Sequence, residues 1–99
     1  MTGQKRILIV GRHQGFVDQV TRLLESVGCI VTSTLSDAVA LDLAISSDYD
    51  ALLIDSEVSQ IDGAYLTTRA RKSKPATPVI VVHGAESVLT QLVQAGVKL

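Results

Sequence analysis

Three short, uninterrupted apolar runs constrain this sequence more than any other feature. They occupy residues 7–10 (ILIV), 51–54 (ALLI) and 79–82 (VIVV), and polar or turn-forming residues bound each of them. Runs of this length and composition are typical of strands that are buried on both faces. A weaker run at 29–34, rich in β-branched residues, predicts a fourth strand nearer an edge. The sequence therefore predicts a sheet with both faces covered.

Segments with the apolar spacing of helices alternate with these runs. The expected helices span about residues 16–27, 37–47, 63–72 and 86–95. Ser36 is an expected N-cap, and Gly28 and Gly96 are expected C-terminal stops. Strand and helix thus alternate four times, and this order predicts parallel strands joined by right-handed crossovers.

Length, charge and cysteine content limit the classes of protein that this chain resembles. The 99 residues suit one domain (1–99), and a net charge of −1 without a basic stripe argues against nucleic acid or a membrane surface as partner. No stretch approaches the roughly 20 apolar residues of a membrane span. The single cysteine, Cys29, excludes an internal disulfide and is expected to be buried and inert. We expect a soluble protein of the reducing cytoplasm.

Five segments in combination carry a resemblance to a known family. They are KRILIV (5–10), LLESVGCIVTST (23–34), YDALLIDSEVSQIDGAYL (49–66), KPATPVIVV (74–82) and LVQAGVKL (92–99). Together they resemble the receiver domain of bacterial response regulators, the CheY-like fold. The resemblance implies a three-layer αβα flavodoxin-like parallel sheet in the strand order 2-1-3-4, with the fifth strand and helix missing or truncated. It also implies a non-enzymatic signalling module of two-component phosphorelays, with a histidine kinase or an output domain as partner.

The resemblance assigns roles to positions at the carboxyl ends of the strands. Receivers accept a phosphoryl group on an aspartate at the end of strand 3, which here is Asp55. An acidic pair after strand 1 holds Mg²⁺ in the family, and that pair falls at Gly11 and Arg12, neither of which can ligate the ion. His83 stands where receivers carry a hydroxyl residue after strand 4. We therefore expect no bound cofactor, although Mg²⁺ is usual in the family.

Two further family features depart from the pattern. The lysine at the end of strand 5 has no counterpart, because Lys98 lies too early to match it. Ser59 and Gln60 replace the proline-glycine turn that follows the phosphoacceptor. Of the active-site residues that the resemblance implies, only Asp55 is retained in its place.

Three interpretations of this site stay open, because the ends of strands 1, 3 and 4 meet at the switch point of such a sheet. In the first, a pseudo-receiver signals by protein contact, and Arg12 or His13 pairs with Asp55 in place of the metal. In the second, Asp55 is still phosphorylated, and Arg12 or His83 supplies the missing positive charge. In the third, His13, Asp55 and His83 bind a metal ion such as Zn²⁺ or another ligand.

The absence of a fifth strand from the pattern leaves the run PVIVV at 78–82 as an apolar sheet edge. Proteins normally cover or pair such an edge. We therefore expect a homodimer, formed by antiparallel pairing of the fourth strand or by exchange of terminal elements, with the fourth helix in or beside the interface.

Overall fold

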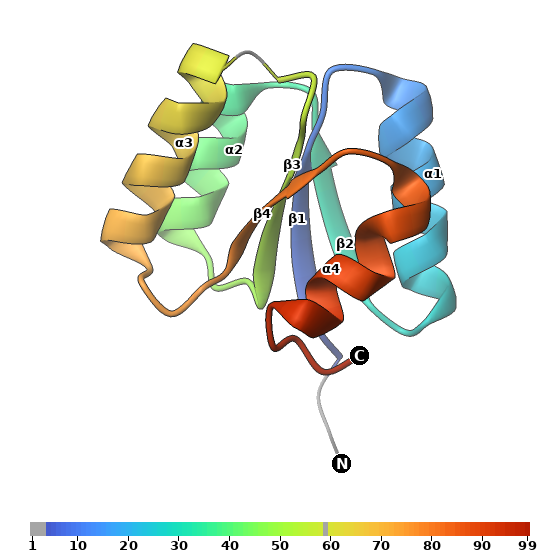
Figure 1. The fold of residues 1–99 in the computed structure, drawn as a ribbon. Helices are drawn as coiled ribbons and strands as arrows, with labels where there is room; N and C mark the ends of the chain where they lie inside the picture. The colour runs from blue at the N-terminus through green and yellow to red at the C-terminus, as the bar shows by residue number, and fades with distance from the viewer. Residues whose placement is uncertain (1–3, 59) are drawn as a thin grey trace.

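The computed structural model describes residues 4–58 and 60–99, apart from the side chains of residues 60–62, and its centre is a four-stranded parallel sheet. The strands are β1 (Arg6–Val10), β2 (Ile30–Thr34), β3 (Ala51–Asp55) and β4 (Val79–Val82). Their order is β2-β1-β3-β4 (Figure 1), as the resemblance implied. The strands β1 and β3 are therefore central, and β2 and β4 are the edges.

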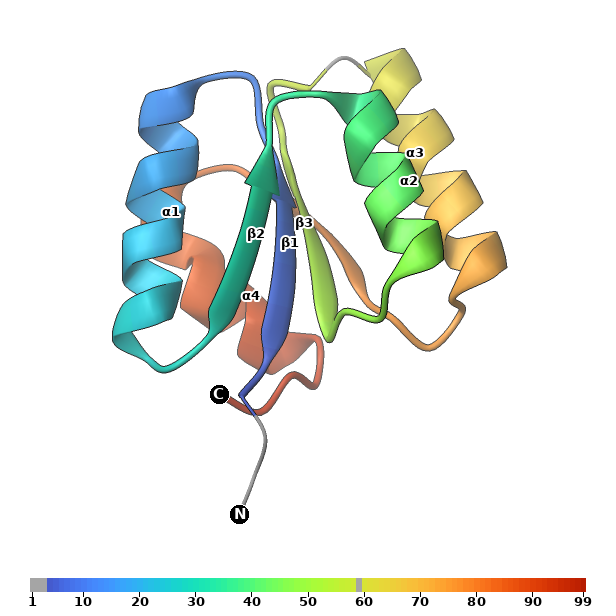
Figure 2. The same ribbon diagram turned by 180° about the vertical axis from the view of Figure 1, so that it is seen from behind.

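Helices cover both faces of this sheet. They are α1 (Gln14–Ser26), α2 (Asp37–Ser46), α3 (Gln60–Ser73), the short 3₁₀ helix η1 (Ala85–Ser87) and α4 (Val88–Gln94). The helices α1 and α4 lie on one face and α2 and α3 on the other (Figures 1 and 2). Crossovers of one hand place α1 opposite α2 and α3, because the chain steps from β1 to β2 in one direction and then back through β3 to β4. The helix α4 follows β4 and joins no further strand among the described residues, so this rule does not set its face. None of the helices among the described residues has the length and apolarity to span a bilayer.

The core consists of two layers that share β1 and β3. Ile7 and Ile9 of β1 face α1 and α4, whereas Leu8 and Val10 face α2 and α3. This alternation follows from the two-residue period of a strand. All four side chains are buried, and each contributes about 1.5–3 kcal/mol by leaving water. Cys29 belongs to the first layer, and burial raises the pKa of its thiol, which agrees with the predicted inert cysteine.

Most predicted helix signals are confirmed. Gly28 and Gly96 adopt φ angles of +89° and +90°, the left-handed conformation that ends a helix most easily at glycine. The hydroxyl of Ser36 accepts a hydrogen bond of 3.2 Å from the backbone N–H of Val39, as an N-cap does.

The predicted start of the third helix is wrong by three residues. The helix α3 begins at Gln60, so Gly63 lies inside it, and glycine's low helix propensity does not set the boundary. A side chain at Gly63 would lie within van der Waals distance of Val58, which shows how closely the helix approaches the end of β3. The last helical segment begins with η1 and continues as α4.

The two sheet edges differ in how they are covered. The strand β2 is partly exposed, as predicted, with Ile30 48% exposed. On β4 the side chain of Val81 is 45% exposed, but the side-chain amide of Gln91 on α4 donates a hydrogen bond of 2.9 Å to the Val81 carbonyl. The predicted bare apolar edge is therefore wrong in part, because one polar side chain covers one of its backbone groups.

Candidate functional site

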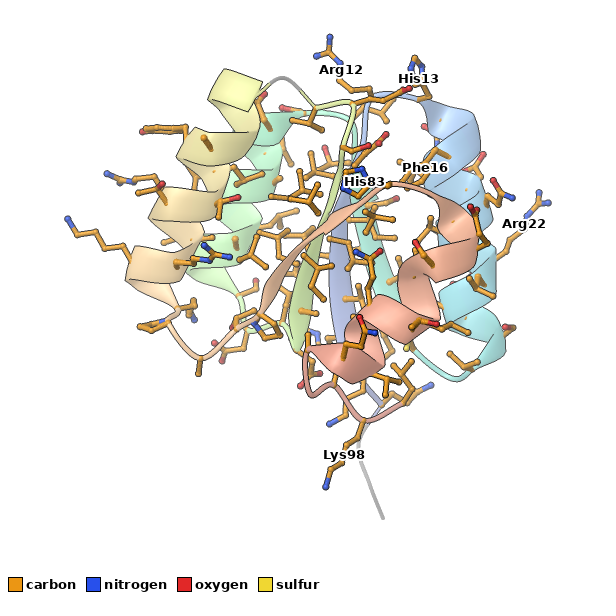
Figure 3. The ribbon with its side chains drawn as sticks, viewed as in Figure 1. Arg12, His13, Phe16, Arg22, His83 and Lys98 are labelled. Carbon is orange, nitrogen blue, oxygen red and sulfur yellow. The ribbon has the colours of Figure 1, made fainter. Side chains whose placement is uncertain are left out.

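The candidate site lies where the carboxyl ends of β1, β3 and β4 meet. The chain leaves β1 through Gly11, Arg12 and His13, leaves β3 at Asp55, and leaves β4 at His83. All three ends lie at the same edge of the sheet (Figure 1). Lys98 lies at the opposite edge (Figure 3), so it cannot supply the family's lysine to Asp55.

Asp55 is the one charged residue in the core among the described side chains. Its side chain is only 4% exposed. One carboxylate oxygen, Oδ1, accepts a hydrogen bond of 3.1 Å from the backbone N–H of Glu57. The other, Oδ2, is buried and has no hydrogen-bond partner among the described residues. A carboxylate in this state is destabilising, because it has lost its water and gained only part of the compensation.

Gly11 faces Asp55 across the gap between β1 and β3. A Cβ atom built at Gly11 would lie 3.7 Å from Oδ2 of Asp55 but only 2.6 Å from Cγ2 of Val17. Real Cβ atoms do not approach other carbons so closely, and Val17 is buried and stiff. The space that a side chain at Gly11 would need is therefore filled by a methyl group of α1.

Neither Arg12 nor His13 pairs with Asp55, so the predicted replacement of the metal's charge is wrong. Arg12 is exposed and directed out into solvent (Figure 3). His13 instead pairs with Glu57, with 2.8 Å between Nε2 and Oε2. Both side chains of this pair are well exposed, at 70% and 62%.

The residues present do not fit the Mg²⁺ that the family implies. Mg²⁺ requires several oxygen ligands in a nearly octahedral array. Gly11 offers no side chain and no space for one, Arg12 is a cation that points away, and Asp55 is the one carboxylate left. In the part of the chain that the structure describes, no three His, Cys, Asp or Glu side chains gather as metal ligands. The predicted metal site of His13, Asp55 and His83 is thus not assembled.

A groove opens beside Asp55, between β4 and α3. It has a volume of about 440 Å³ and a floor that includes Ile54, Val58 and Val81. Asp55 and the exposed His83 also line the groove. His83 therefore borders the groove and forms no part of a metal site.

Sequence reasoning missed two residues that shape this site. Glu57 contacts Asp55 through its backbone and His13 through its side chain, and an acidic residue in a loop gives no sign of either contact in the sequence. Val17 fits the apolar spacing of its helix like its neighbours, yet it closes the space at Gly11. A glycine where a side chain is expected was the available signal for Val17. Of the replaced turn, Ser59 and the side chain of Gln60 lie outside the described residues.

Comparison with known proteins assigns the family. The family profile described as the response regulator receiver domain matches residues 7–98, nearly the whole chain. The chain belongs to the response regulator receiver domain family. Receiver domains are signalling modules of two-component systems and interact with histidine kinases or output domains. A search of curated proteins gives no significant match.

Solved structures show the same fold. A CheY-like receiver domain protein of Methanospirillum hungatei JF-1 is 22% identical, with a TM-score of 0.73 over 95% of this chain and 77% of that chain. The receiver domain of the hybrid histidine kinase CckA is also 22% identical, with a TM-score of 0.77 over 94% and 99%. A response regulator of Burkholderia pseudomallei, solved with a phosphorylated aspartic acid, a calcium ion and citrate, is 18% identical, with a TM-score of 0.75 over 94% and 69%.

Proposed function

We propose that this chain is a pseudo-receiver, a signalling module that acts by protein contact without Mg²⁺-dependent phosphorylation of Asp55. The observation that carries the proposal is the closed space at Gly11. A side chain there would collide with Cγ2 of Val17 at 2.6 Å, so the position that should hold a metal-binding carboxylate has no room for one.

The charge balance at Asp55 supports the same proposal. Attack of a carboxylate on a phosphoryl group brings negative charges together, and enzymes and receivers alike offset this with metal ions or cationic side chains. Arg12 points into solvent, His13 is paired with Glu57, and Asp55 itself is buried. The described residues thus place no cation against Asp55 to neutralise an incoming phosphoryl group.

Partner contact then rests on surfaces of the fold. The groove beside β4 and the free edge of β4 are partly apolar surfaces next to the site. We propose a histidine kinase or an output domain as the signalling partner, a homodimer as the assembled form, and the cytoplasm as the compartment. The exposed Val81, which lies both in the groove and on the edge, supports contact there.

Beryllofluoride with Mg²⁺ tests the proposal. This phosphoryl mimic binds a receiver's aspartate only when the metal is bound beside it. We expect no rise in melting temperature with beryllofluoride and Mg²⁺ together, and no shift of the backbone resonances of residues 55–58. Mg²⁺ alone and beryllofluoride alone are the controls for non-specific effects.

The retained Asp55 also supports a second candidate function, that of a working phosphoreceiver, and the same experiment would reveal it. A melting temperature that rises with both reagents together, and not with either alone, would show a working phosphoreceiver. Asp55→Asn should then abolish the rise. His83→Ala would show in the same assay whether the imidazole beside the groove supplies the missing charge.

A further inference from the structure

The outer edge of β4 carries backbone groups that no strand among residues 4–58 and 60–99 pairs. The carbonyls of Pro78 and Val82 accept hydrogen bonds of 2.9 Å from the backbone N–H groups of Leu52 in β3 and of Ser56, which directly follows β3. Alternate residues of a strand direct their backbone groups to opposite sides, so Val79 and Val81 direct theirs away from β3. The Val81 carbonyl is the one that Gln91 contacts, which agrees with this direction.

Gln91 is held in place for this contact by its own neighbours. Its Oε1 accepts a hydrogen bond of 3.1 Å from the hydroxyl of Ser87, and its Nε2 donates to the Val81 carbonyl at 2.9 Å. The Ser87 hydroxyl also lies 3.0 Å from the Gly84 carbonyl. Buried Val88 and Leu92 fix α4 against the sheet on either side of Gln91. The amide of Gln91 thus acts as the N–H of a missing neighbouring strand.

We propose that Gln91 is a guard that limits pairing of β4 with β4 of a second copy of this chain. The proposal rests on the homodimer of the proposed function, and it names the interface and what controls it. The free edge of β4 can pair with the same edge of a second copy, with the two strands antiparallel and Ile80 at the centre of the pair. An antiparallel pair centred there places Val79 of one copy opposite Val81 of the other, and opposite residues of this kind exchange two hydrogen bonds.

The guard and the second copy compete for the same atom. Each Val79–Val81 pair needs the Val81 carbonyl as an acceptor, and Gln91 already occupies it. The pairing would also bury the exposed Val81 side chain against Val79 of the second copy on the α3 side of the sheet, where β-branched cross-strand pairs are favourable. Dimerisation therefore gains apolar burial but first has to displace one side-chain hydrogen bond in each protomer.

Analytical ultracentrifugation of the full chain tests the guard. Gln91→Ala keeps a good helix former in α4 and frees the Val81 carbonyl. We expect the dimer dissociation constant to fall by about tenfold to a hundredfold, because the two Gln91–Val81 hydrogen bonds no longer have to be broken when the dimer forms. Ser87→Ala should shift the constant in the same direction by less, because it only loosens Gln91. Gln94→Ala, the same change at an exposed position of α4, is the matched control and should leave the constant unchanged.

A second variant identifies the interface. Val81→Lys on the Gln91→Ala background places a charge on the free edge and should return the protein to a monomer. A dissociation constant that is the same for Gln91→Ala and the natural chain would overturn the guard, and so would a Gln91→Ala dimer that Val81→Lys does not weaken.

The outcomes for the guard and for the homodimer are distinguishable. A natural chain that stays monomeric while Gln91→Ala dimerises supports the guard and removes the homodimer from the proposed function. A natural dimer whose affinity Gln91→Ala does not change keeps the homodimer and overturns the guard.

Discussion

The end of β3 and the free edge of β4 lie side by side, but they are closed in different ways. At the end of β3, Asp55 is buried, and a methyl group of Val17 fills the space beside it that a side chain at Gly11 would need. At the edge of β4, a single side-chain hydrogen bond from Gln91 covers one carbonyl. The first closure belongs to the core, whereas the second is a reversible contact at the surface.

This difference indicates which of the two regions can change state during signalling. Forcing a larger side chain into a packed core costs about 1–3 kcal/mol, and no ordinary fluctuation of a side chain relieves it. Giving up one hydrogen bond costs about 0.5–1.5 kcal/mol, which a partner's contacts readily offset. In this receiver, the surface at β4 is thus better suited to respond than the chemistry at Asp55.

The largest effect is expected from filling the space at Gly11. Gly11→Ala should lower the free energy of unfolding by about 1–3 kcal/mol, because the new methyl group collides with Val17. The matched control is Gly15→Ala, where a Cβ meets nothing within 4 Å. Since Gly15 lies in α1, that change should stabilise the protein by about 0.5–1 kcal/mol. Urea unfolding measures both changes. Equal effects at the two glycines would contradict the claim that Val17 fills the space beside Gly11.

Neutralising Asp55 should have the next largest effect. Asp55→Asn keeps an Oδ1 acceptor for the backbone N–H of Glu57 and removes a buried charge whose second oxygen has no partner among the described residues. We expect the free energy of unfolding at neutral pH to rise by about 1–2 kcal/mol.

The exposed Asp42 on α2 provides the control for Asp55→Asn. Asp42→Asn should change stability by less than about 0.5 kcal/mol. A clear loss of stability in Asp55→Asn would show that the carboxylate is satisfied in solution by a bound cation, and would reopen the question of phosphorylation.

A smaller effect is expected at the edge of β4. Gln91→Ala should lower the free energy of unfolding of the monomer by about 0.5–1.5 kcal/mol, the value of the hydrogen bond to Val81. The measurement is thermal or urea unfolding at a protein concentration where ultracentrifugation shows a monomer. A larger loss of unfolding free energy in Gln91→Ala than in Gly11→Ala would contradict the conclusion that the edge of β4 is the more weakly held of the two regions.

The smallest effect is expected at the pair of His13 and Glu57. Glu57→Gln removes the carboxylate that contacts His13 but keeps the backbone N–H that donates to Asp55. Because both side chains are largely exposed, stability should change by less than about 0.5 kcal/mol. A loss above 1 kcal/mol in urea unfolding would mean that this pair, and not the packing at Gly11, holds the site closed.

The fold could be predicted from the sequence because its signals are local and repeat along the chain. Apolar runs indicated β1, β3 and β4. Gly28 indicated the end of α1, because glycine adopts the positive φ angle found there more easily than other residues. The start of α3 could not be predicted, because Gly63 is a poor helix former that tertiary packing keeps inside the helix. The guard at Gln91 was also out of reach, since a glutamine on a helix gives no sign of which carbonyl it will contact.

The site could be predicted only as a set of positions. The resemblance placed Gly11, Asp55 and His83 at one edge of the sheet, and the structure agrees. The sequence does not show where side chains point, so Arg12 was expected beside Asp55 although it faces solvent. The partner that His13 does contact, Glu57, lies on a loop distant in sequence. Side-chain direction and contacts between loops decide this chemistry, and both need coordinates.

Incubation with acetyl phosphate and Mg²⁺, followed by intact mass spectrometry, tests the central claim most directly. The account predicts that the natural chain and Asp55→Asn give the same spectrum, without the mass of an added phosphoryl group. A receiver with a complete acidic pair, treated in parallel, shows that the reagents are active. Phosphorylation of the natural chain that maps to Asp55 and disappears in Asp55→Asn would contradict the account.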